Sequence, residues 1–398
     1  MMTQIVKNID WVGYVDWNVR DFHSFDTFRG ATYNSYLIRD TKTALIDAVK
    51  APYAGRLLQS ITEKTALDKV DYVVCNHAEP DHAGGLGEVL AALPNAVLLC
   101  NKKCLEFLAG YFDTSRWKTQ VITPDDKIPL GQFSLQFVNT PMVHWPESMF
   151  TYIPEEQILF SMDAFGQHLA TSERFDDQYD LSYIMQEAKT YYANIVTPYS
   201  KQVQRTLESA AALPLKVIAP SHGLIWRKNP GSIVEAYKDW SGGKYLPKVL
   251  IVYDSMWNST EILAQAVLGG AVSESEKIDV QLMHVRKTPA TRIAAEMLDA
   301  AAVAFGTATL NMQMMPQLSG VLTYLRGLKF SPKSAFAFGS YGWAQSGVNL
   351  LEQWIEETGW TKTADSLAVQ LRPKPQDIAR AKEAGKALAR AALERTQH

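Results

Sequence analysis

The sequence of 398 residues contains few cysteines, no excess of one charge and no long apolar run, and each absence excludes a class of protein. An odd count of 3 cysteines excludes a disulfide framework and is typical of a reducing compartment. The sequence has 39 Lys and Arg and 42 Asp and Glu, so it lacks the basic excess that is typical of a nucleic-acid-binding protein. No stretch reaches the roughly 18 apolar residues that span a bilayer, and the first residues lack a secretory signal. We predict a cytoplasmic protein that binds neither nucleic acid nor a membrane.

A breaker-rich stretch at residues 241–247, SGGKYLP, divides the sequence into two parts of ordinary domain size. We therefore predict one domain over residues 1–245 and another over residues 246–398. In the second part, short apolar runs alternate with helical patterns, which predicts an α/β fold with a doubly wound parallel sheet. The expected strands of this sheet are Lys248–Tyr253, Ile278–His284, Ala301–Gly306, Ala335–Gly339 and Leu367–Leu371.

The first part mixes strands and helices less regularly. Some of its apolar runs are joined by short turns and others by helical patterns, which predicts a mixed sheet between helices. The expected strands are Tyr33–Arg39, Thr43–Ala48, Tyr72–Asn76, Ala96–Cys100, Phe133–Val138 and Lys216–Pro220.

The most specific motif, CNHAEPDHAGG at residues 75–85, lies between an expected strand and a glycine-marked helix start. It holds four potential metal ligands within six residues, namely His77, Glu79, Asp81 and His82. Imidazole and carboxylate groups that converge at a strand-to-helix turn are typical of a metal site. The alternative is a polar loop that caps the helix.

This motif resembles the H-x-H-x-D-H loop of the metallo-β-lactamase fold, with Glu79 in place of the second histidine. That replacement is typical of the flavodiiron proteins. The resemblance implies a metallo-β-lactamase-like αββα first domain and further ligands downstream. Matching residues follow later apolar runs at His144, Asp163 and His222.

Four imidazoles and three carboxylates suit two metal ions, and the carboxylates favour iron over the zinc of His-rich hydrolases. We therefore predict a pair of iron ions. The resemblance implies that Asp163 bridges the pair. It also implies two sets of terminal ligands, His77, Glu79 and His144 for one ion, and Asp81, His82 and His222 for the other.

Two further residues, His23 and Tyr191, match family positions that line the substrate pocket. We expect them to supply a proton or a hydrogen bond near the metals. The alternative is a surface histidine and ordinary core packing of the tyrosine.

The loop after the first strand of the second domain, DSMWNST at residues 254–260, carries three hydroxyl side chains at a helix start. Such a loop forms an anion cradle, and since it lacks Lys and Arg, it suits a phosphate monoester bound by neutral donors. Neither the P-loop nor the G-x-G-x-x-G pattern is present. Loops 306–311 and 339–343 follow the third and fourth strands, where doubly wound sheets bind ligands.

The family resemblance makes this second domain flavodoxin-like and implies that the three loops hold FMN. The predicted contacts are Ser255, Met256, Trp257, Asn258, Ser259, Thr260, Thr307, Ala308, Thr309, Leu310, Asn311, Ser340, Tyr341, Gly342 and Trp343.

The resemblance implies an oxidoreductase that reduces dioxygen to water, nitric oxide to nitrous oxide, or both. Electron counting agrees, because a flavin hydroquinone and a diferrous pair together store the four electrons that dioxygen consumes. Two alternatives are a zinc hydrolase with an appended flavodoxin-like domain and an electron-transfer flavoprotein on an inactive metal domain. Glu79 and the flavin loops disfavour the first, and the complete ligand set disfavours the second.

The three cysteines are too few for the paired Cys-x-x-Cys motifs of a fused rubredoxin, which some family members carry. We therefore expect a separate electron donor, either rubredoxin or a reduced deazaflavin coenzyme. The resemblance also implies a head-to-tail homodimer, or a dimer of dimers, which brings the flavin of one subunit beside the metals of the other. Trp343 is expected near this inter-subunit route.

Overall fold

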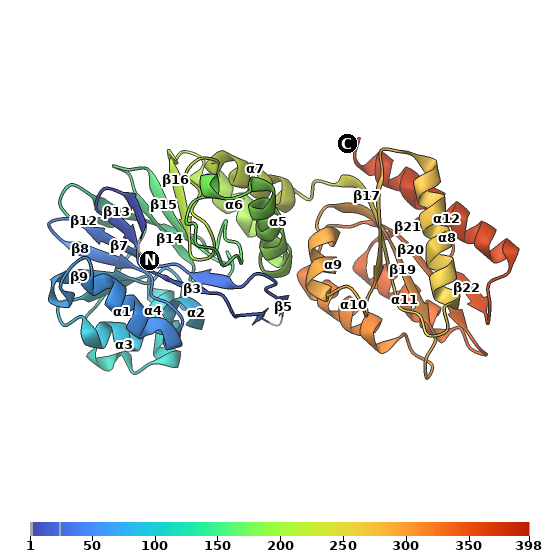
Figure 1. Ribbon diagram of the computed structural model, residues 1–398, viewed down its shortest axis with the longest axis horizontal. Helices are drawn as coiled ribbons and strands as arrows, with labels where there is room; N and C mark the ends of the chain where they lie inside the picture. Colours follow the sequence, from blue (N-terminus) through green and yellow to red (C-terminus); the bar gives the residue numbers. More distant parts are fainter. Residues whose placement is uncertain (1–2, 24, 398) are drawn as a thin grey trace. The chain divides into compact units, whose positions relative to one another are not determined.

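The computed structural model describes residues 3–23 and 25–397 and separates into two compact units (Figure 1). The first unit comprises Met1–Tyr192 and Tyr199–Lys238, and the second comprises Ala193–Pro198 and Asp239–His398. Among the residues described, no helix is both long and apolar enough to cross a membrane.

Two sheets face each other in the first unit. One has seven strands in the order β1 (Thr3–Val6), β2 (Ile9–Trp11), β7 (Tyr36–Arg39), β8 (Thr43–Ile46), β9 (Val70–Val74), β10 (Val97–Cys100) and β11 (Thr119–Val121). The other has five, in the order β12 (Lys127–Pro129), β13 (Ser134–Asn139), β14 (Met149–Ile153), β15 (Ile158–Met162) and β16 (Val217–Pro220). Two further antiparallel sheets have two strands each. β3 (Tyr14–Asp16) pairs with β6 (Ala31–Tyr33), and β4 (Asp21–Phe22) pairs with β5 (Phe25–Asp26).

The core of this unit lies between the two sheets. Ile46 and Val74 from the first sheet belong to one buried cluster with Phe137 and Phe160 from the second. Helices cover the outer faces (Figure 1): α1 (Ala54–Thr62), α2 (Pro80–Ala83), α3 (Leu86–Ala92) and α4 (Lys102–Tyr111) lie on one side, and α5 (Leu181–Tyr191), α6 (Ser200–Ala210) and α7 (Pro230–Gly242) on the other. The predicted αββα layering is confirmed.

The second unit is a parallel sheet with helices on both faces (Figure 1). Its strand order is β18 (Asp279–His284), β17 (Leu246–Tyr253), β19 (Ala300–Ala308), β20 (Ser334–Tyr341) and β21 (Thr361–Lys362), and β22 (Leu367–Gln370) also pairs with β20. Its helices are α8 (Ser259–Glu274), α9 (Ala290–Met297), α10 (Pro316–Leu328), α11 (Ser346–Thr358) and α12 (Pro375–Arg395). This is the predicted doubly wound arrangement, in which the order reverses between β17 and β19.

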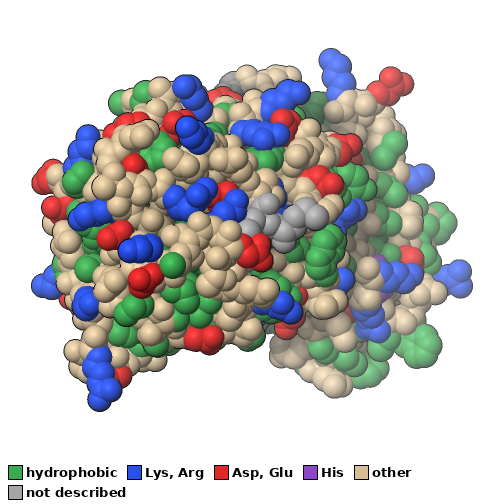
Figure 2. Space-filling model, turned by 60° about the vertical axis from the view of Figure 1, so that its left-hand side comes forward, with side chains coloured by type: hydrophobic (Ala, Val, Ile, Leu, Met, Phe, Trp, Pro, Cys, Tyr) green, Lys and Arg blue, Asp and Glu red, His purple; other side chains and the backbone are tan. Residues whose placement is uncertain are grey.

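Several sequence-based boundaries were wrong. β19 and β20 extend to Ala308 and Tyr341, so residues that were expected in loops continue the sheet and pair with neighbouring strands. α7 ends at Gly242 and β17 begins at Leu246, which shortens the expected breaker stretch to residues 243–245. On the face shown in Figure 2, positive and negative side chains are interspersed.

Candidate metal centre and flavin site

All seven predicted metal ligands come together at the ends of strands in the first unit. His77 and Glu79 follow β9, and Asp81 and His82 belong to the short helix α2. The other three lie in the loop after β13 (His144), directly after β15 (Asp163) and after β16 (His222). All seven side chains are buried, and short strands that end at one edge of a sandwich bring these distant residues together.

Asp163 lies between two sets of ligands and faces each with a different oxygen. Its Oδ2 is 3.2 Å from His77 Nε2 and 3.3 Å from His144 Nε2. Its Oδ1 is 3.0 Å from His82 Nε2 and 3.4 Å from His222 Nε2. One carboxylate thus points at two separate groups of imidazoles, which is the geometry of a bridging ligand.

A second carboxylate completes each set. Glu79 Oε2 lies 3.1 Å from His77 Nε2 and 3.0 Å from His144 Nε2. Asp81 Oδ2 lies 3.2 Å from His82 Nε2 and 3.0 Å from His222 Nε2. The donor atoms of each set lie within 4.8 Å of one another, which is close enough to surround one cation.

Unsatisfied polar atoms show that the site fits metal ions. Both oxygens of Asp81, Oδ2 of Asp163, and Nε2 of His82 and of His222 are buried without a hydrogen-bond partner among the described residues. Each such atom costs about 1–3 kcal/mol unless a partner compensates it. Two cations would satisfy all of these atoms at once.

The electrostatics of the site support the same conclusion. Burial lowers the pKa of His144, but the neighbouring carboxylates of Asp163 and Glu79 outweigh it and raise that pKa to about 9. Burial also lowers the pKa of His222, but the neighbouring carboxylates of Asp163 and Asp81 outweigh it and raise that pKa to about 10. The carboxylates therefore attract positive charge strongly, and metal ions would replace protons on these imidazoles.

Outer hydrogen bonds orient two of the imidazoles. Nδ1 of His77 lies 2.7 Å from Oε1 of Glu147, which also accepts the backbone N–H of Ala78 at 3.0 Å. Nδ1 of His222 lies 2.6 Å from the carbonyl oxygen of Thr32. In both residues Nε2 is left to face the carboxylates, as in metal-ligating histidines. Glu147 was not among the predicted site residues, although it lies only three residues after His144.

The two predicted proton-donating residues contact the ligand carboxylates. The Tyr191 hydroxyl donates to Asp163 Oδ1 at 2.8 Å, and burial together with that negative charge raises the pKa of Tyr191 well above its usual value. His23 Nε2 lies 2.7 Å from Glu79 Oε1, and its side chain is 34% exposed. His168 is also buried beside this centre, with its ring centre 4.9 Å from that of His222, and burial lowers its pKa well below the usual value.

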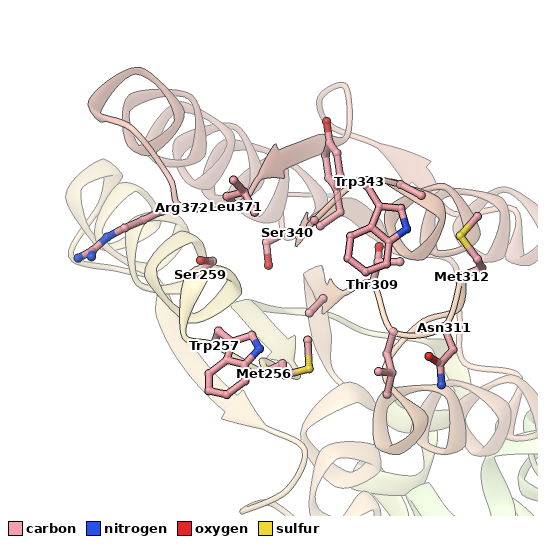
Figure 3. A pocket seen from close by; sticks show the side chains of 15 residues that line it. Met256, Trp257, Ser259, Thr309, Asn311, Met312, Ser340, Trp343, Leu371 and Arg372 are labelled. Atoms are coloured by element: carbon pink, nitrogen blue, oxygen red, sulfur yellow. The ribbon is translucent and has the colours of Figure 1, made fainter.

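The second unit contains a cavity of about 580 Å³ at the carboxyl ends of β17, β19 and β20 (Figure 3). Eleven predicted flavin contacts line it: Met256, Trp257, Ser259, Ala308, Thr309, Leu310, Asn311, Ser340, Tyr341, Gly342 and Trp343. The indoles of Trp257 and Trp343 border it and are 83% and 92% exposed. A cavity of this size with flat aromatic side chains at its rim fits a flavin ring.

The other four predicted contacts do not line the cavity. Thr260 and Thr307 are buried, where Thr260 Oγ1 lies 2.8 Å from Ser340 Oγ and Thr307 accepts a backbone N–H. Asn258 takes a left-handed conformation, φ 63°, at the start of α8. Ser255 Oγ is buried without a hydrogen-bond partner among the described residues, and it stands in the loop before α8, where a phosphate would satisfy it.

Four cavity residues were missed by the sequence analysis, namely Met312, Ala344, Leu371 and Arg372. Arg372 supplies a positive charge that the 254–260 loop lacks (Figure 3). Its position after β22, more than 100 residues away along the chain, gave no local signal.

The sequence and the structure both match known proteins over nearly their whole length. A family model described as "ODP family beta lactamase" matches residues 31–223, and a flavodoxin model matches residues 251–385. A nitric oxide reductase of Moorella thermoacetica is 41% identical over 97% of each chain. The flavodiiron protein of Giardia intestinalis is 36% identical in sequence and matches the structure with a TM-score of 0.97. The match covers 100% of this chain and 98% of the Giardia chain. The rubredoxin oxygen:oxidoreductase of Desulfovibrio gigas is 34% identical with the same TM-score and covers 100% of both chains.

The chain belongs to the flavodiiron protein family. This membership confirms the predicted family and fold class. It also confirms the predicted cofactors, because a flavodoxin domain implies FMN and the family implies a non-haem diiron centre. It favours the predicted oxidoreductase over the zinc hydrolase. The matched regions contain every predicted metal ligand and every predicted FMN contact of this flavodiiron protein.

We expect Glu147→Gln to weaken iron binding by about 10- to 100-fold, because the neutral amide no longer fixes the His77 tautomer. Competition between the apoprotein and a chelator for Fe²⁺ measures this. Glu155→Gln is the matched control, since Glu155 binds Ser134. Equal iron affinity of Glu147→Gln and the unchanged protein would contradict the proposed orienting role.

We expect Ser255→Ala to weaken FMN binding by about 10- to 150-fold, the effect of one hydrogen bond of about 1.5–3 kcal/mol to a charged group. Flavin fluorescence titration measures it. Ser273→Ala, which removes a hydroxyl bonded to the Gly270 carbonyl, is the control. Riboflavin has no phosphate, so its affinity should stay the same, and an equal loss for both flavins would place the effect elsewhere.

Proposed function

We propose that this flavodiiron protein reduces dioxygen to water, nitric oxide to nitrous oxide, or both. The observation that carries the proposal is Asp163, whose two oxygens serve two ligand sets in a chain that also holds a flavin cavity. The named activities of the Moorella thermoacetica and Desulfovibrio gigas proteins support it. When bound, FMN and two iron ions would supply the electrons.

The residues of the chain would provide the protons. Tyr191 holds its proton on Oη beside Asp163, and its raised pKa keeps it a hydrogen-bond donor at neutral pH. His23 contacts Glu79 from a partly exposed position, so it can exchange protons between water and the centre. We propose Tyr191 as the inner hydrogen-bond donor and His23 as the proton entry point.

The flavin would receive its electrons from a separate redox partner. Rubredoxin is the donor we propose first, since the Desulfovibrio gigas relative is named for it, and a reduced deazaflavin coenzyme is the alternative. Trp343, at 92% exposure beside the flavin cavity, is a side chain that a second chain would cover. This supports the proposed head-to-tail homodimer or dimer of dimers.

Two further predictions stay proposals. We place the domain boundary between residues 245 and 246, since α7 ends at Gly242 and β17 begins at Leu246. We propose a cytoplasmic location from the three free, buried cysteines, which suit a reducing compartment.

Stopped-flow oxidation of the reduced, iron-loaded protein by each gas tests the function. We expect rapid flavin oxidation by at least one gas, with iron near two per chain by mass spectrometry. A protein with two irons and reduced FMN that reacts with neither gas would overturn the proposal. Zinc in place of iron, with hydrolase activity, would favour the alternative.

Tyr191→Phe should slow gas turnover by about 10- to 100-fold, because it removes the proton held beside Asp163. Iron content and FMN affinity should not change, since the hydroxyl is outside both ligand sets. Tyr192→Phe is the matched control, because the neighbouring hydroxyl lies 3.0 Å from Ser200 Oγ instead. Unchanged turnover in Tyr191→Phe would remove Tyr191 from the proton route.

A further inference from the structure

Three tyrosines of the first unit form a row that begins beside the metal ligand His222. Tyr33 lies on β6, Tyr53 lies directly before α1, and Tyr14 lies on β3. The rings of Tyr33 and Tyr53 are 5.5 Å apart, centre to centre, and the rings of Tyr53 and Tyr14 are stacked at 3.9 Å. Tyr33 is buried and Tyr14 is partly exposed, so the row leads from the metal centre towards solvent.

Tyr33 is connected to His222 in two ways. The two rings meet edge to face, with their centres 6.0 Å apart. Nδ1 of His222 also lies 2.6 Å from the carbonyl oxygen of Thr32, and that carbonyl is joined to Tyr33 by a peptide bond. One hydrogen bond and one peptide group therefore connect a ligand imidazole with the first tyrosine, which is a short path for an electron.

A buried carboxylate contacts the middle tyrosine. The Tyr53 hydroxyl donates to Asp16 Oδ2 at 2.6 Å, and Asp16 Oδ1 accepts the backbone N–H groups of Asn18 and Val19, each at 3.1 Å. Burial and this carboxylate raise the pKa of Tyr53 above its usual value, so the phenol keeps its proton at neutral pH. A phenol loses an electron most easily when a hydrogen-bonded base takes its proton at the same time, and Asp16 is placed to do so.

We propose that Tyr53 and Tyr14 supply electrons to the metal centre through Tyr33 when dioxygen arrives and the flavin cannot deliver them. The inference rests on the proposed function, with dioxygen as the oxidant, and adds a reserve electron route to it. Dioxygen takes four electrons, and a chain that carries only two would leave it at the level of peroxide. Electrons from the tyrosines complete its reduction to water.

Each transfer moves one electron and one proton. Tyr53 gives its electron towards the centre and its proton to Asp16, which leaves a neutral radical on Tyr53. Tyr14 then passes an electron to Tyr53, Asp16 returns the proton, and Tyr14 releases its own proton to water. A one-electron reductant in solution, such as ascorbate, restores Tyr14 with an electron, and water supplies the proton. Two such transfers provide the two missing electrons, and the four protons of the two product waters come from solvent.

Electron paramagnetic resonance of the frozen holoprotein tests the proposal. Protein with FMN and iron bound is reduced by two electrons per chain, mixed rapidly with dioxygen and frozen. We expect the signal of a tyrosyl radical, which ring-deuterated tyrosine narrows and which is thereby distinguished from a flavin radical. Nitric oxide should give no such signal, because two molecules of it need only the two electrons already present.

Tyr53→Phe and Asp16→Asn test the route within the chain. Phenylalanine keeps the ring stacked on Tyr14 but has no phenol, and asparagine keeps an oxygen for the two backbone N–H groups but is not a base. We expect each variant to lower the yield of the tyrosyl signal at least about 10-fold, because no proton can leave with the electron. Tyr152→Phe is the matched control, since this buried tyrosine donates to the Pro214 carbonyl at 2.7 Å, and its signal should be unchanged.

Absence of a tyrosyl signal from the unchanged protein would overturn the proposal, and so would an equal signal in Tyr53→Phe. In both cases gas reduction by the unchanged protein leaves the proposed function standing. An unchanged protein that consumes neither gas overturns the proposed function and the tyrosine route together.

Discussion

The structure of the first unit depends on the position of Asp163. Its carboxylate is fully buried among imidazoles from three other segments, and this is tolerable only because opposite charge surrounds it. Burial raises the pKa of Asp163, and the neighbouring imidazoles outweigh burial and hold that pKa well below its usual range. The two sheets, their short loops and the ends of β9, β15 and β16 position the partners of this one group.

Much of the site could be predicted because its ligands are encoded locally. Four of them lie within six residues, and the other three each follow an apolar run that ends a strand. Glu147 could not be predicted this way, because its role depends on a contact with His77 that arises only on folding. An outer hydrogen bond has no sequence spacing of its own.

The fold, too, could be predicted only in part from the sequence. The parallel sheet of the second unit was predictable because its strands read as continuous apolar runs between helical patterns. β14 and β15 were missed in the first unit because Thr151 and Ser161 interrupt their apolar runs, and these hydroxyls find their hydrogen-bond partners only on folding. Arg372 was missed for a third reason, since a lone cation at a strand end acquires meaning only beside the flavin cavity.

Glu79 divides its two oxygens between different neighbours. Oε2 faces the imidazoles of the buried set, and Oε1 meets His23, which is in contact with water. Through this contact a partly exposed side chain touches a buried ligand carboxylate. A change in the protonation or position of His23 would therefore act on Glu79, a carboxylate that would hold one of the two metal ions.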